Sequence, residues 1–276
     1  MNNIMPKISS ILEQTIPLKD YINKYQKIEI QFFRKEEGET VFNFETTIRE
    51  YSKIFNFKEV TIHPPLEHYE LEYILFRNKE GFLESVKKAV ELSKELNIKI
   101  NLLYHARWEF EFLKYAITDT IREAIEIIGD TNVILILENS TMVAERKHCS
   151  VLDFCEYIGS PKLKFCLDIC HIYCQANMYK MDIYEHIGKY LDKEKCSKYL
   201  YQIHFSYTAK NDGYIDKKTH GIMHPNKEEV AKDIRILKDY AGFTDKTIWV
   251  TEVGEKNYTT REDQIQEIRW LEEIDM

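Results

Sequence analysis

The chain has 276 residues, of which 44% are hydrophobic and 30% are charged, a composition typical of a folded domain with a sizeable core. Its net charge is -8, and Lys and Arg are spread among Asp and Glu, so no broad basic face for nucleic acid is indicated. Glycine is scarce, with nine residues, and no glycine-rich phosphate-binding motif occurs.

Cellular location is indicated by the start of the chain and by its cysteines. The first residues, MNNIMPKISS, lack a basic leader followed by an apolar run, and no stretch approaches the roughly 20 apolar residues of a membrane span. The six cysteines form no Cys-x-x-Cys pair. We therefore expect a cytoplasmic protein with reduced thiols and no membrane partner.

Short apolar runs alternate with longer amphipathic segments along the whole chain. In chain order, strands are predicted near 7–11 and at 28–33, 59–63, 98–105, 132–138, 163–168, 199–206 and 247–252. These runs are rich in Ile, Val, Leu and Phe and mostly lack strict alternation, as expected for strands buried on both faces of a parallel sheet.

Helices are predicted between the strands. Amphipathic patterns cover 81–96, which Asn97 suits as a C-cap, and then 112–128, 227–240 and 260–274. Polar residues that suit other helix starts are Asp20, Glu45, Ser150 and Asn226. Eight strands in βα order predict a single (β/α)8 TIM barrel that forms one domain over residues 1–276.

Six of the eight predicted strands end in an imidazole or a carboxylate. In chain order these residues are His63, His105, Glu138, Asp168, His204 and Glu252. Any one of them alone is ordinary for a loop, but the C-terminal ends of barrel strands converge on one mouth. Six such groups left unpaired there would be costly, and a divalent metal offsets that cost. Carboxylate and imidazole ligands suit Zn, Mn, Co or Fe.

Other residues extend this candidate metal site. His171 follows Asp168 in CLDICH and faces the same mouth if a helix begins after the strand. His220 and His224 lie in THGIMHP and are metal ligands or surface histidines of a long loop. Arg107 and Trp108 follow a strand end, where they would hold a phosphate or stack on a sugar, or else be solvated loop residues.

The segments IHPP, LYH, LENS, CLDICH, IHFS, THGIMHPN and TEVG occur in the order seen in the xylose isomerase-like TIM barrels. The chain resembles this superfamily, also known as AP endonuclease family 2, over nearly its whole length. The superfamily includes sugar-phosphate isomerases and epimerases as well as endonuclease IV. The LEN and CLDICH segments carry the resemblance most specifically.

The resemblance to the epimerase branch implies a four-ligand metal site of Glu138, Asp168, His204 and Glu252. The two glutamates would also act as acid and base, and His171 would bind substrate. The resemblance to the endonuclease branch implies a metal cluster instead, in which His63 and His105 bind one further metal and His171 with His220 another. Three features depart from that branch: Lys218 stands where it has Asp, its glycine-rich start is absent, and the glycine-rich segment after its loop histidine is replaced by IMHPNKEE.

The function expected is metal-dependent isomerisation or epimerisation of a sugar or sugar-like small molecule, by proton transfer through a metal-stabilised enediolate. The alternative is an endonuclease IV-like phosphodiester hydrolase acting on abasic-site DNA, and only this alternative has nucleic acid as a partner. A third interpretation is a metal-binding or ligand-binding barrel without catalysis. Metal stoichiometry distinguishes the first two, because one metal per chain favours the isomerase and two or three favour the hydrolase.

Overall fold

The barrel is formed by eight parallel strands that pair in the order of the sequence, with β8 closing against β1. The computed structural model describes residues 3–32, 44–64, 71–106, 109–140, 149–178, 180–208 and 221–274. The strands are β1 (Ile4–Ser9), β2 (Lys27–Gln31), β3 (Glu59–His63), β4 (Lys99–Ala106), β5 (Val133–Asn139), β6 (Leu163–Asp168), β7 (Leu200–Phe205) and β8 (Ile248–Thr251). The predicted (β/α)8 TIM barrel is therefore confirmed.

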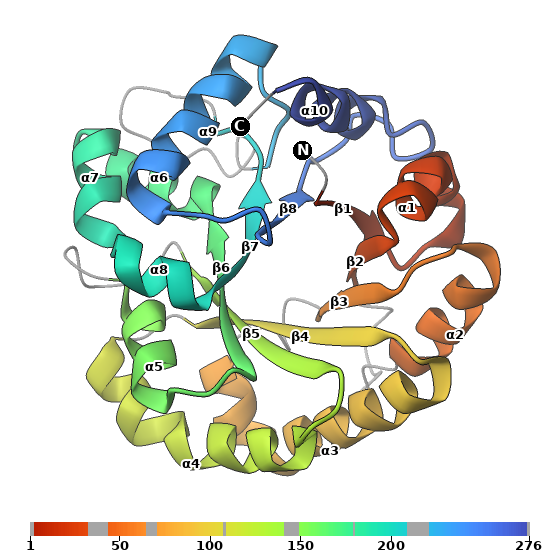
Figure 1. Ribbon diagram of the computed structural model, residues 1–276, viewed down its shortest axis with the longest axis vertical. Coiled ribbons are helices and arrows are strands. Elements are labelled where there is room, and N and C mark those ends of the chain that lie inside the picture. The colour runs from red at the N-terminus through yellow and green to blue at the C-terminus, as the bar shows by residue number, and fades with distance from the viewer. Residues whose placement is uncertain are drawn as a thin grey trace.

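Helices surround the barrel on its outer face (Figure 1). They are α1 (Lys19–Tyr25), α2 (Phe44–Ile54), α3 (Leu71–Leu96), α4 (Phe110–Ile128), α5 (Ser150–Ile158), α6 (Ile169–Met178), α7 (Ile183–Tyr190), α8 (Lys193–Tyr199), α9 (Lys227–Ala241) and α10 (Glu262–Glu273). Three of them, α6, α7 and α8, lie between β6 and β7, so the chain departs there from strict alternation. Among the residues that the structure describes, no helix is long and apolar enough to cross a membrane.

The predicted strands agree with the structure to within two residues at each end, except for the first. The first strand was expected near 7–11, whereas β1 runs from Ile4 to Ser9. Pro6 and Lys7 interrupt the apolar pattern at that point, and the prediction therefore began too late. Helix α3 begins at Leu71 rather than at residue 81, and Asn97 follows it with a positive φ of 52°, as a C-cap residue does.

Alternation along the strands divides their side chains between two environments. Ile28, Ile30 and Ile62 belong to the large apolar cluster that the strands share with the surrounding helices. Smaller apolar clusters, including Leu103, Ile136, Cys166 and Val250, come from the alternate strand positions. Side chains two residues apart on a strand share a face. These alternate positions form the inner face of the barrel. Two residues further along each strand, the same face carries the side chains at the strand ends, which therefore lie at the C-terminal mouth of the barrel.

Candidate metal centre

Four side chains from consecutive strands meet at the C-terminal mouth of the barrel. Glu138 ends β5, Asp168 ends β6, His204 lies on β7 and Glu252 directly follows β8. Each offers one ligand atom, and these four atoms all lie within 4.8 Å of one another. Nδ1 of His204 is 2.8 Å from Oε2 of Glu252 and 3.3 Å from Oε1 of Glu138. The fold thus brings together residues that are separated by up to 114 positions in the sequence (138 to 252).

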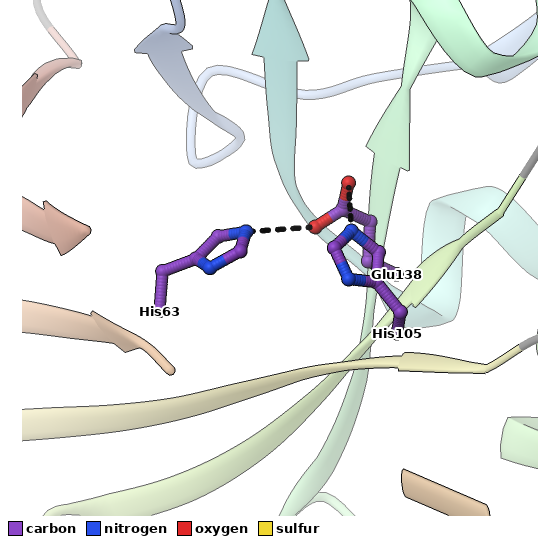
Figure 2. A group of neighbouring side chains, drawn as sticks. All are labelled: His63, His105 and Glu138. Atoms are coloured by element: carbon purple, nitrogen blue, oxygen red, sulfur yellow. Dashed lines mark ion pairs between the residues drawn. The ribbon is translucent and has the colours of Figure 1, made fainter. Parts of the chain in front are cut away.

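Two more histidines, from β3 and β4, also approach Glu138. Nε2 of His105, on β4, lies 3.0 Å from Oε1 of Glu138, and Nε2 of His63, at the end of β3, lies 3.9 Å from Oε2 (Figure 2). The two imidazole rings are edge to face, with centroids 5.3 Å apart. Together with Glu138 they offer a second group of three ligand atoms within 4.8 Å of one another.

His171 joins the same cluster from the first turn of α6. Its backbone N–H donates to Oδ1 of Asp168 at 3.1 Å, and its Nε2 is 3.3 Å from Oδ2 of that residue. Its Nδ1 is 2.6 Å from the carbonyl oxygen of Asn139 and 3.6 Å from Oε1 of Glu138. The helix that begins directly after β6 therefore points His171 at the mouth, as its spacing from Asp168 predicted.

The remaining residues singled out in the sequence do not join this cluster in the described structure. Arg107, Trp108 and His220 lie outside the described residues. His224 is buried elsewhere, between Glu267 of α10 and Asp233 of α9, with Nδ1 and Nε2 at 2.5 and 3.3 Å from their carboxylate oxygens. The interpretation of His224 as a metal ligand is therefore not supported.

Sequence reasoning missed two charged residues in the barrel interior, Lys7 on β1 and Glu29 on β2. Nζ of Lys7 is 2.6 Å from Oε1 of Glu252 and 3.2 Å from Oε1 of Glu29. Oε2 of Glu29 is 3.0 Å from Nε2 of His204. With these two residues, every strand of the barrel supplies a charged or imidazole side chain to one connected cluster. The only signal in the sequence was a charged residue next to apolar ones inside each strand, which does not reveal what that residue contacts.

The charges in the cluster hold its carboxylates in their ionised form. Burial disfavours the ionised form of Glu138, yet His105 and His204 hold its pKa well below the usual value. Burial acts on Glu252 in the same way, and Lys7 and His204 likewise hold its pKa well below the usual value. Both glutamates are therefore carboxylates at neutral pH.

The imidazoles differ in their protonation. Burial lowers the pKa of His63 to about 3, with smaller contributions from Lys7 and His105, so its ring is neutral at pH 7. Burial also disfavours the imidazolium of His204, but the negative groups around it raise its pKa well above the usual value. A cation next to Nδ1 of His204 would therefore displace a proton, as metals do when they bind histidine.

Several buried polar atoms of the cluster lack a hydrogen-bond partner among the described residues, and this indicates whether a divalent cation fits the cluster. Oε2 of Glu138, Nδ1 of His204 and Oε2 of Glu252 are buried and have no hydrogen-bond partner within the part of the chain that the structure describes. Because Nε2 of His204 faces Glu29, its Nδ1 is the nitrogen that a cation would use, and a carboxylate behind a ligand histidine is a common way of fixing that choice. Oxygen and imidazole donors suit Zn, Mn, Co or Fe, so the residues present fit such an ion.

Solved structures with the same fold span almost the whole chain. A D-tagatose 3-epimerase-like protein matches with a TM-score of 0.60 and 18% identity, over 97% of each chain. A Thermus thermophilus protein soaked with zinc chloride matches with a TM-score of 0.61 and 15% identity, over 100% of each chain. The IolI protein with a bound zinc atom matches with a TM-score of 0.59 and 14% identity, over 97% of this chain and 95% of its own.

At these identities the solved structures establish the fold alone. No curated protein matches the sequence. The family model described as the xylose isomerase-like TIM barrel matches residues 24–273, which include every strand from β2 to β8 and the four clustered candidate ligand residues. The chain therefore belongs to the xylose isomerase-like TIM barrel family.

Proposed function

We propose that the protein is a metal-dependent isomerase or epimerase of a sugar or sugar-like small molecule. The observation that carries this proposal is the group Glu138, Asp168, His204 and Glu252, whose ligand atoms lie within 4.8 Å of one another. Three polar atoms of these residues, Oε2 of Glu138, Nδ1 of His204 and Oε2 of Glu252, are buried without a hydrogen-bond partner in the described structure, which is a costly arrangement unless a cation joins them. A divalent Zn, Mn, Co or Fe ion held by the four side chains removes that cost.

The proposed reaction is a proton transfer at a carbon next to a carbonyl group. Glu138 and Glu252 come from strands that are not adjacent, so they can flank a substrate at the mouth and exchange its proton. A bound divalent ion would supply Lewis-acid stabilisation of the negative charge that develops on the substrate oxygens. His171 contacts both Asp168 and Glu138 and is placed to hydrogen-bond a hydroxyl group of the substrate. Arg107 and Trp108 remain proposed substrate contacts.

Two features of the molecule support a small polar substrate. The cluster is acidic overall and the chain has a net charge of -8, which disfavours a long polyanion such as DNA. Solved structures with the same fold include the D-tagatose 3-epimerase-like protein and the zinc-bound IolI protein. A carbohydrate-like substrate and a single bound ion are therefore the first combination to test.

Elemental analysis of the purified protein, followed by assay against a panel of ketoses, tests this proposal. We expect one divalent ion per chain and epimerisation or isomerisation of at least one ketose. Glu138→Gln removes both a ligand charge and a base, and we expect it to lower the activity at least 100-fold, as removal of an acid–base group typically does (about 10²–10⁴-fold). A wild-type protein that binds no divalent ion would refute the proposal.

Glu59→Gln is the matched control for this experiment. Glu59 is also a buried glutamate of the barrel, but its Oε2 pairs with Lys27 at 2.7 Å and its Oε1 accepts from Asn101 at 3.0 Å, away from the ligand group. We expect this variant to keep the wild-type metal content and activity. A loss of activity equal to that of Glu138→Gln would show that general damage to the barrel, not the proposed chemistry, is being measured.

A second candidate function rests on His63, His105 and Glu138, whose ligand atoms form a separate group within 4.8 Å. A second metal held by these three residues would favour a phosphodiester hydrolase that acts on abasic-site DNA, and the bound ions would supply activation of water. This candidate predicts two or three ions per chain, of which His63→Ala removes one, and incision of abasic-site DNA that is lost in Glu138→Gln. A protein that binds metal but shows neither activity would favour the third interpretation, a metal-binding barrel without catalysis.

A further inference from the structure

Lys7 is the unusual member of the cluster, because it brings a fixed positive charge to a site built from acidic and imidazole groups. It lies on β1 and its side chain is only 9% exposed. Its register partner on β2 is Glu29, and β1 also pairs with β8, the strand that Glu252 follows. The closure of the barrel thus places the ammonium group between two carboxylates that come from opposite ends of the chain.

The two oxygens of Glu252 have different neighbours as a result. Oε1 accepts from Nζ of Lys7 at 2.6 Å. Oε2 faces Nδ1 of His204 at 2.8 Å and has no hydrogen-bond partner in the described structure. Oε2 is therefore the oxygen that is available to a cation next to His204, whereas Oε1 is already bound by a charged donor. A charge-assisted hydrogen bond of this kind is roughly twice as strong as a neutral one.

We propose that Lys7 is a positioning residue that restricts Glu252 to a single ligand oxygen. This inference rests on the proposed function, because it concerns the ion that the four ligands would hold. Carboxylates bind divalent ions through one oxygen or through both. An ammonium group on Oε1 prevents the second mode, and so a coordination position stays open for a substrate, as catalytic metal sites require. Glu29, which Lys7 also contacts, fixes the opposite side of the same site through His204.

The test compares how cobalt-loaded variants bind imidazole, a small neutral ligand that needs an open coordination position. Visible absorption of the cobalt ion reports the binding, and imidazole is added to the wild type, Lys7→Met and Lys7→Arg. We expect Lys7→Met to bind cobalt but to need at least about tenfold more imidazole, because Glu252 then occupies the open position with Oε1. Lys7→Arg keeps a charged donor, and we expect its imidazole affinity to stay within about threefold of the wild type.

The outcomes separate this inference from the proposed function. Wild-type protein that binds no cobalt refutes the proposed function, and the inference with it. Unchanged imidazole affinity in Lys7→Met overturns only the inference. Loss of cobalt binding in Lys7→Met also overturns it, because Lys7 would then be needed to hold the ion rather than to limit Glu252.

A second variant keeps the test decisive if Lys7→Met does not fold. Removal of the ammonium leaves Glu29, which is fully buried, without its cation. The double variant Lys7→Met with Glu29→Gln removes one positive and one negative charge together, and it keeps an amide oxygen that can face Nε2 of His204. We expect this double variant to show the same loss of imidazole affinity of about tenfold or more. Imidazole affinity equal to that of Glu29→Gln alone would contradict the proposal.

Discussion

At the scale of single residues, a buried charge is stabilised where an opposite charge or a hydrogen-bond donor meets it. His224 shows this outside the candidate metal centre. It is fully buried, its backbone N–H donates to Oε2 of Glu267 at 3.2 Å, and its ring lies between Glu267 and Asp233. The ring also stacks on Phe205, with centroids 4.8 Å apart. His224 therefore ties β7 to α9 and α10 by charge as well as by packing.

The protonation of His224 predicts a pH dependence of stability. Burial opposes the imidazolium, but Asp233 and Glu267 raise the pKa of His224 from 6.5 to about 9. Since the folded pKa lies above the ordinary value, the stabilisation is complete below pH 6.5 and is lost as the pH rises through 9. Comparison of wild type with His224→Gln by urea denaturation should show their difference in unfolding free energy shrinking by about 2 kcal/mol between pH 7 and pH 9.5.

His186→Gln is the control for this experiment. His186 is also fully buried, but burial lowers its pKa, so its ring is neutral in the folded protein throughout that pH range. The difference between wild type and His186→Gln should stay constant from pH 7 to pH 9.5. If the difference in unfolding free energy between wild type and His224→Gln also stayed constant over this pH range, His224 would be a neutral ring in the folded protein.

At the scale of elements, helix α9 begins where its sequence predicts, because a side chain completes its first turn. Oδ1 of Asn226 accepts from the backbone N–H of Glu229 at 3.0 Å, as an N-cap residue does. Asn226→Ala should lower the unfolding free energy by about 1 kcal/mol, whereas Asn226→Asp should change it by only a few tenths. Urea denaturation of both variants measures this, and equal stabilities of Asn226→Ala and wild type would contradict it.

The strand ends were predictable because an apolar run stops there at a polar side chain. His63 and Asp168 end β3 and β6 as the sequence indicates, and two-residue periodicity then puts each on the inner face of the barrel. Lys7 and Glu29 were not predictable in this way. Each lies inside its strand, and only the pairing of β1 with both β2 and β8 brings Lys7 to Glu29 and Glu252. Such contacts between distant segments leave no local pattern in the sequence.

The predicted start of α3 was wrong by ten residues. The amphipathic pattern predicted a helix from residue 81, and glycine weakens a helix interior by roughly 1 kcal/mol relative to alanine. The structure continues α3 through Gly81 from Leu71, and the carbonyl oxygen of Gly81 accepts from Oγ of Ser85 at 2.9 Å. The predicted βα order implies one helix between β6 and β7, whereas the structure has three, and short helices of seven to ten residues carry weak periodicity in the sequence.

At the scale of the whole molecule, the barrel and its helices enclose all six cysteines as free thiols. None is more than 2% exposed. Burial is the largest cause that raises the pKa of every one of them, to about 12 for Cys149 and Cys166 and about 11 for Cys174. A thiol that is both inaccessible and protonated does not react, because the thiolate is the nucleophile.

Thiol labelling therefore reports opening of the barrel. The cysteines lie on β6, α5, α6 and α8 or next to them, so most of the second half of the barrel must loosen before a reagent reaches them. We expect no thiol to react with a disulfide reagent in the native protein at pH 8 over minutes, and all six to react in denaturant. The native labelling rate should follow the unfolding equilibrium when stability is varied with urea. A cavity of about 210 Å³ adjoins Cys149 between α5 and α7. Rapid labelling of one thiol that disappears in Cys149→Ser would therefore contradict the prediction and reveal local opening at this cavity.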